Sequence, residues 1–137
     1  MIYYLRSWSP LHTVIVHRLL GCAAPDGSPS PCTVELVQAV DFRVPSAPRR
    51  LRAFVVPAGF RYDRATMPLA ARALVDRDRL DPAALAHDWA LSVRYDWALS
   101  RRDCDRLFLN VALLTPGLSR WRARLAYLAV RIASLIG

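Results

Sequence analysis

Residues 32–44 read CTVELVQAVDFRV, and this stretch decides the class of the fold. Its apolar side chains recur at every second position, a spacing that places them on one face of a β-strand. That face consists of Val34, Leu36, Val40, Phe42 and Val44, and only Gln38 interrupts it. The other face is mostly polar. The pattern therefore predicts one half-buried strand over residues 32–44.

Two further strands are expected around this one. Residues 11–20 contain a run of β-branched side chains, and residues 51–56 form a short apolar stretch that Pro57-Ala58-Gly59 ends. The intervening segments are rich in proline, glycine, serine or arginine and are typical of turns. Residues 1–57 are therefore predicted to be mainly β.

Residues 80–137 are predicted to be mainly helical. Asp81 followed by Pro82 is a start signal for a helix that would run to about Arg94. Ser100 and Asp103 have the spacing of a capping box, which predicts a second helix to about Leu114.

A last helix is expected after Ser119, which is a suitable capping residue. Its apolar residues with helical spacing are Leu125, Leu128, Ile132 and Leu135. Before the first helix, residues 63–79 are interpreted as a loop through Pro68 and a short helix over 69–75. The expected fold is α+β: a small N-terminal antiparallel β-sheet followed by three to four packed helices.

The composition fits a single folded domain over residues 1–137. A hydrophobic fraction of 54% with 22% charged residues excludes a disordered chain, and three cysteines are too few for a disulfide scaffold. The net charge is +8, and all 19 basic residues are arginine. This charge favours anionic partners, namely nucleic acid, anionic lipid or an acidic protein. The apolar segment 125–136 is too short for a transmembrane helix and carries Arg131.

His87 and Asp88 stand in the middle of an apolar helical segment, AALAHDWAL. Buried polar groups need partners, so one interpretation pairs His87 with a backbone carbonyl and Asp88 with an arginine. The functional interpretation makes His87 a general base and Asp88 a metal ligand. Asp105 follows Arg101 by four residues, which is also the spacing of a surface ion pair on a helix.

Four motifs together resemble an uncharacterised protein family found mainly in phages and prophages. Its pattern reads VPAGFxTDxASxP, then HDYLY, then RxxAD with an aromatic residue three positions later. The corresponding stretches here are 56–68, 86–91 and 101–108, and the closing segment 127–131 is similar to the final helix of that family. The resemblance implies a phage or prophage protein.

A helix-borne His-Asp pair followed by an Asp on the next helix also resembles the catalytic core of secreted phospholipase A2. This resemblance implies that His87 is the base, that Asp105 orients it and that Asp88 holds a calcium ion or another divalent cation. The loop from Gly59 to Asp63 would supply further metal ligands. Leu91 stands where both patterns have tyrosine, which implies that Asp105 lacks one partner.

Two functions follow from these resemblances. One is a metal-dependent, phospholipase A2-like hydrolase that acts on a membrane or envelope ester, with anionic lipid as partner. The alternative is a phage structural or tail assembly protein in which the His-Asp motif is a structural polar network and other phage structural proteins are the partners. Specific nucleic-acid binding is not expected, because the arginines are scattered along the chain.

The expected location is the host cytoplasm or the phage particle. Leu19-Leu20-Gly21-Cys22 resembles a lipoprotein cleavage box, but His17 and Arg18 interrupt the apolar run that a signal peptide needs.

Overall fold

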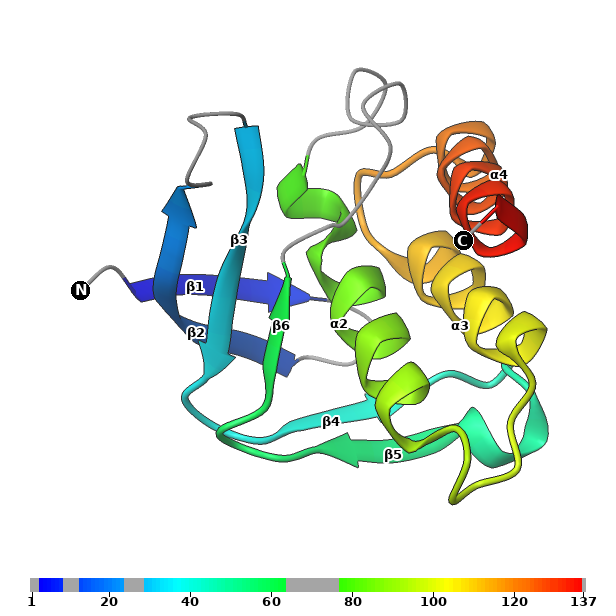
Figure 1. Ribbon diagram of the computed structural model, residues 1–137, viewed down its shortest axis with the longest axis horizontal. Helices are drawn as coiled ribbons and strands as arrows, with labels where there is room; N and C mark the ends of the chain where they lie inside the picture. The colour runs from blue at the N-terminus through cyan, green and yellow to red at the C-terminus, as the bar shows by residue number, and fades with distance from the viewer. Residues whose placement is uncertain (1–2, 9–12, 24–28, 64–76, 137) are drawn as a thin grey trace.

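The computed structural model describes residues 3–8, 13–23, 29–63 and 77–136. The fold is α+β, as predicted, with antiparallel strands at the N-terminal end and packed helices after them. In Figure 1 the four-stranded sheet lies to the left of helix α2 (Arg77–Val93), and helices α3 (Arg101–Leu114) and α4 (Arg120–Ile136) lie to its right. The other two strands, β4 (Val40–Arg43) and β5 (Ala53–Val56), run below α2. The predicted short helix over residues 69–75 lies outside the described residues.

Four strands form the larger sheet, in the order β1-β2-β3-β6 with every pair antiparallel. Their bounds are Tyr3–Trp8 for β1, Thr13–Ala23 for β2, Pro29–Leu36 for β3 and Arg61–Asp63 for β6. The predicted first strand corresponds to β2. Strand β1 was not predicted, and β6 lies where a loop was expected. Tyr62 of β6 stands opposite Val34 of β3, so β6 is held by a partner distant in sequence.

The predicted single strand over residues 32–44 is wrong, because the chain bends after Leu36. Its second half is β4 (Val40–Arg43), which pairs with β5 (Ala53–Val56) in a separate two-stranded sheet. A short 3₁₀ helix, η1 (Arg49–Leu51), lies between these two strands. The predicted apolar face is confirmed, since all five of its side chains are buried.

The turn between β5 and β6 explains the glycine in the first motif. The amide of Phe60 donates to the carbonyl of Pro57 at 3.3 Å, and Gly59 has a φ of 87°. A turn of this kind needs a residue at positive φ in its third position, where glycine carries no steric cost. The amide of Gly59 also donates to the carbonyl of Leu36 at 2.9 Å, which ties the turn to β3.

Helix α2 spans Arg77–Val93 and begins earlier than predicted. Asp81 is therefore not an N-cap, and Pro82 lies inside the helix. A proline there removes one backbone hydrogen bond, to the carbonyl four residues earlier. Burial of the segment accounts for the helix continuing through it, since Leu80, Asp81 and residues 83–86 are all buried.

Helix α3 (Arg101–Leu114) begins and ends as predicted. The capping box is present: the Asp103 amide donates to Ser100 Oγ at 3.0 Å, and the Ser100 amide donates to Asp103 Oδ2 at 3.2 Å. Gly117, with a φ of 77°, lies in the turn that leads to helix α4 (Arg120–Ile136). Ser119 precedes α4, and its carbonyl accepts from the Ala123 amide at 3.0 Å.

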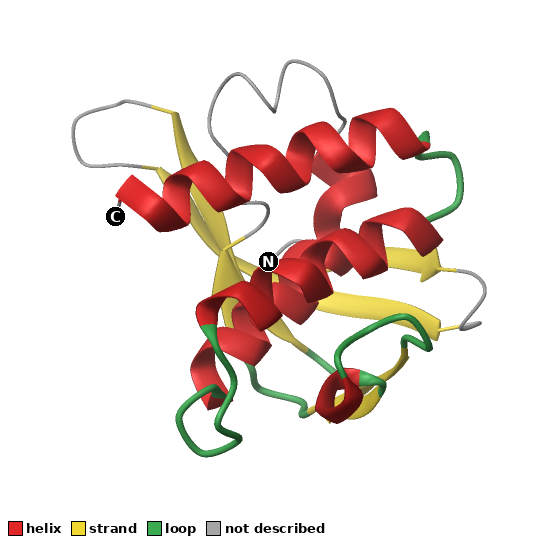
Figure 2. Cartoon of the chain, turned by 90° about the vertical axis from the view of Figure 1, so that its right-hand side faces the viewer, coloured by secondary structure: helices red, strands yellow, loops and turns green. Residues whose placement is uncertain are grey.

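The apolar stripe predicted on α4 does not face the core. Leu125, Leu128, Ile132 and Leu135 are exposed, whereas Ala123, Ala126 and Val130 are buried. Figure 2 shows α4 running across the front of the molecule, with α3 below it. In the described part of the chain, no helix has both the length and the apolar character needed to cross a membrane.

Stacked aromatic rings fix α2 against the two-stranded sheet. Phe54 of β5 stacks on Phe42 of β4, with ring centroids 5.0 Å apart, and on Trp89 of α2 at 4.7 Å. Trp97 then meets Trp89 edge-on at 5.0 Å. Trp89 lies two residues after His87, so this packing also sets the position of the polar pair on α2.

Candidate functional site

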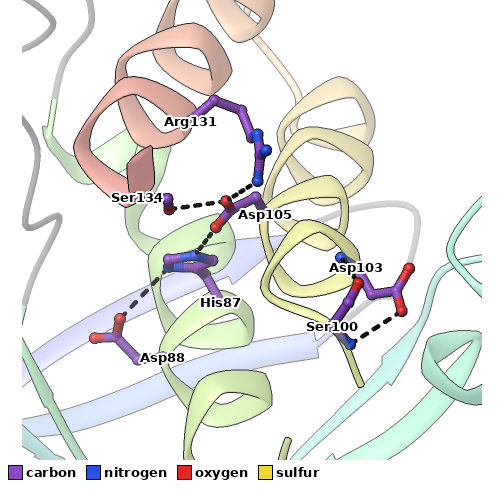
Figure 3. A network of polar contacts seen from close by, with 7 residues as sticks. All are labelled: His87, Asp88, Ser100, Asp103, Asp105, Arg131 and Ser134. Carbon is purple, nitrogen blue, oxygen red and sulfur yellow. Dashed lines mark hydrogen bonds and ion pairs between the residues drawn. The ribbon is translucent and has the colours of Figure 1, made fainter. Parts of the chain in front are cut away.

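His87 and Asp105 form the closest polar contact between the helices. The imidazole Nε2 lies 2.7 Å from Asp105 Oδ1, which is a short, well-formed hydrogen bond. His87 comes from the middle of α2, and Asp105 comes from the second turn of α3, where the capping box fixes the helix start. The two helices pack side by side, so the contact spans a helix interface (Figure 3).

Asp105 is completely buried and receives two further hydrogen bonds from α4. Arg131 Nη1 and Ser134 Oγ each donate to Asp105 Oδ2 at 2.8 Å. The carboxylate therefore joins three helices. The interpretation of Asp105 as the partner of Arg101 in a surface ion pair is wrong, because Asp105 is buried and its partners lie on α2 and α4. Leu91 does not leave Asp105 short of partners either, since α4 supplies two.

The protonation of this pair follows from its surroundings. Burial alone would raise the pKa of Asp105, but the hydrogen bonds from His87, Ser134 and Arg131 outweigh it and lower that pKa. For His87 the effect of burial has the opposite sign and would lower the pKa. The hydrogen bond to Asp105 and the interaction with Asp88 outweigh it and raise the pKa of His87 above its ordinary value. Asp105 is thus a carboxylate at neutral pH, and His87 Nε2 is the ring nitrogen that carries a proton.

Phe108 closes one side of the imidazole. It follows Asp105 by three residues on α3, is almost fully buried, and meets the His87 ring edge-on with centroids 5.9 Å apart. The His87 side chain retains 13% exposure, and Asp105 has none. The imidazole is therefore largely, but not completely, shielded from solvent.

Asp88 lies near Nδ1, the other ring nitrogen. Its Oδ1 is 3.8 Å from His87 Nδ1, which is an ion-pair distance too long for a hydrogen bond, and its side chain is 27% exposed. The structure thus brings together His87, Asp88 and Asp105, three of the residues that the sequence singled out. His87 bonds a carboxylate and not a backbone carbonyl.

Gly59 and Asp63, the other expected metal ligands, lie at opposite ends of β6. Gly59 belongs to the turn before the strand, and Asp63 is its last residue. An extended strand rises about 3.3 Å per residue, so these two residues are separated by roughly the length of the strand. The described residues contain no group of three or more His, Cys, Asp or Glu side chains placed to hold a metal.

Arg131 and Ser134 are site residues that sequence reasoning missed. A signal was present, because they interrupt the apolar segment 125–136 at a spacing of three, which puts both on one helix face. Buried polar groups of this kind need a partner on a neighbouring element. Cys104, beside Asp105, is a buried free thiol whose pKa burial raises to about 11, so it is not an activated nucleophile.

Residues 35–130 match the protein family described as "Protein of unknown function (DUF1353)". The match covers well over half of the chain, and the chain therefore belongs to this family. It includes His87, Asp88 and Asp105 and stops just before Arg131. No curated protein and no solved structure matches the chain.

Proposed function

We propose that this protein is a hydrolase in which His87 is the general base and Asp105 orients it. The observation that carries the proposal is the 2.7 Å hydrogen bond between His87 Nε2 and the buried Asp105. With Nε2 protonated, the neutral imidazole has its lone pair on Nδ1, the nitrogen that lies near the partly exposed Asp88. A base in this position removes a proton from water as the water attacks a substrate carbonyl.

Asp105 would act as a positioning residue. A fixed carboxylate holds the imidazole in one tautomer and stabilises the imidazolium that forms when the base takes a proton. Arg131 and Ser134 hold that carboxylate in turn, since both bond its second oxygen. The base would therefore be oriented by all three helices.

A divalent cation, in the first instance Ca²⁺, is part of the proposal, with Asp88 as its ligand. Asp88 offers hard carboxylate oxygens near His87 Nδ1, and calcium requires six to eight oxygen ligands. A bound cation would stabilise the negative charge that develops on an ester oxygen. Asp63 stays a candidate second ligand. Gly59, in the turn before β6, stays a candidate through its backbone carbonyl.

The proposed substrate class is an ester of a membrane or envelope lipid, and the proposed setting is a phage or prophage. The motif order in 56–68, 86–91 and 101–108 supports the setting by resemblance. The net charge of +8 supports an anionic substrate surface.

The test is hydrolysis of phosphatidylglycerol vesicles, with calcium and with a chelator. The wild type should release fatty acid only with calcium, and His87→Ala should lose at least about a hundredfold in rate. Asp88→Asn should need more calcium, while Asp96→Asn, the same change at an exposed position after α2, should behave as the wild type. Absence of calcium-dependent release from the wild type would refute the hydrolase.

A second candidate function is that of a phage particle protein in which the same residues are a structural network. The observation in its favour is the complete burial of Asp105 with donors from two helices. A buried carboxylate that is hydrogen-bonded to both His87 and Arg131 holds three helices together whether or not the site catalyses a reaction. An inactive wild type together with a destabilised His87→Ala variant would support this function.

A further inference from the structure

The outer face of α4 carries an apolar stripe that no other described element covers. Trp121, Leu125, Leu128, Ile132 and Leu135 form this stripe, and each is at least 36% exposed. Their spacing alternates between four and three residues. At 100° per residue these side chains fall within a sector of about 80°. A continuous exposed stripe of this length marks an interaction surface.

The polar residues beside the stripe are cationic. Arg120 and Arg124 lie on one side of it and Arg122 on the other, and all three are exposed. The Arg122 guanidinium lies over the Trp121 ring, 5.2 Å from its centroid. No aspartate or glutamate occurs after Asp105 in the printed sequence, so neither α4 nor the turn before it offers a negative charge.

We propose that the α4 stripe is a docking surface for an anionic lipid bilayer, on which α4 lies parallel to the membrane plane. Charge complementarity selects this occupant. A helix with leucine, isoleucine and tryptophan on one face and arginines at its borders binds the boundary between headgroups and acyl chains. Tryptophan is favoured at that depth, and arginines there meet lipid phosphates.

A second copy of the chain fits the stripe less well. Paired helices with this spacing are normally held in register by opposite charges at the positions beside the apolar seam. The only charged residues that two α4 helices would bring to those positions are arginines. An anionic bilayer supplies the missing negative charge on both sides of the stripe.

The test is co-sedimentation of the full chain with vesicles of equal parts phosphatidylglycerol and phosphatidylcholine, against vesicles of phosphatidylcholine alone. The double variant Leu128→Ser/Ile132→Ser should bind the anionic vesicles at least about tenfold more weakly. Its control is Val37→Ser/Val55→Ser, which removes two apolar side chains of similar exposure from outside α4. That control should bind as the wild type.

The electrostatic contribution to vesicle binding is tested with a separate variant. Arg122→Gln/Arg124→Gln should weaken binding about thirtyfold at low salt, whereas Arg43→Gln/Arg102→Gln, which removes two exposed arginines elsewhere, should change it by less than about threefold. All of these binding measurements are made with a chelator, under which the proposed hydrolase is inactive, so the result is independent of whether the site hydrolyses the vesicles.

Three outcomes would overturn the inference. One is equal sedimentation of the wild type with anionic and neutral vesicles. Another is unchanged binding by Leu128→Ser/Ile132→Ser. The third is a stable dimer in sedimentation equilibrium that the same double variant converts to a monomer, which would assign the stripe to a second copy.

Discussion

Asp105 has no exposed surface, so the free energy of its carboxylate depends entirely on neighbouring side chains. An ionised group without solvent is tolerated only when charges and hydrogen bonds replace its hydration. His87, Arg131 and Ser134 do this for both carboxylate oxygens. An amide in its place removes the negative charge opposite Arg131 and leaves one acceptor oxygen where the carboxylate has two.

Asp105→Asn is therefore expected to lower the free energy of unfolding by about 3 kcal/mol, measured by urea denaturation. Asp96→Asn, the same chemical change at an exposed position, should cost less than about 0.5 kcal/mol. Equal stability of the two variants would show that the network around Asp105 contributes little to the fold.

His87 makes stability depend on pH. The pKa of His87 is higher in the folded protein than in the unfolded chain, so folding favours its protonated form. Its stabilising contribution is complete below the unfolded pKa of about 6.5 and is lost as the pH rises through the folded pKa. The wild type should thus lose stability relative to His87→Gln as the pH increases from 5 to about 9.

This difference is measured by urea denaturation of both proteins across the pH series. Taking the difference removes the contributions of His12 and His17, which both proteins share. Parallel curves for the two proteins would contradict the raised pKa.

At the scale of elements, the start of α3 determines where Asp105 lies. The reciprocal hydrogen bonds of Ser100 and Asp103 satisfy backbone and side-chain groups at the first turn, and Asp105 follows two residues later. Ser100→Ala should cost about 1 kcal/mol in unfolding free energy, and Ser100→Thr should retain most of the stability. Ser92→Ala, at an exposed serine near the end of α2, is the control and should change stability by less than about 0.5 kcal/mol. Equal losses for Ser100→Ala and Ser92→Ala would show that the cap is dispensable.

Elements were predictable from sequence where the signal is local. The capping box and the extent of α3 depend on neighbouring residues, and the alternation over 32–44 shows which side chains share a face. Strand β6 has three residues and takes its partner from β3, far away in sequence, so no local pattern reveals it. The Asp81-Pro82 start signal failed because α2 already begins at Arg77, and the helix continues through Pro82 where Leu80, Asp81 and residues 83–86 are buried.

The residues of the site were also predictable only where the sequence signal is local. His87, Asp88 and Asp105 stand in short motifs, whereas the role of Arg131 and Ser134 depends on how α4 packs. Helical spacing on α4 shows that Leu128 and Ile132 share a face, but it does not show whether that face meets the core or solvent. In the fold the small residues Ala123 and Ala126 face inward, which lets α4 approach α3 closely.

At the scale of the whole molecule, Phe54 connects the strands to the helices. Its ring stacks between Phe42 and Trp89, and it is 5% exposed. Phe54→Ala should lower the unfolding free energy by about 3–5 kcal/mol, measured by urea denaturation. Val55→Ala, the next residue with 55% exposure, should change it by less than about 0.5 kcal/mol. Similar losses of unfolding free energy for Phe54→Ala and Val55→Ala would mean that the sheet and the helices are stabilised separately.

The three hydrogen bonds of Asp105 can all form only after the ribosome has made α4. Ribosomes make α2 and α3 before α4, so a nascent chain contains Asp105 and His87 well before Arg131 and Ser134 exist. Until α4 emerges, one carboxylate oxygen lacks its donors and keeps its hydration only if that side of α3 stays open to water. Messages truncated within α4 would therefore yield chains that cannot close around Asp105, and proteases that recognise unpacked helices would remove them.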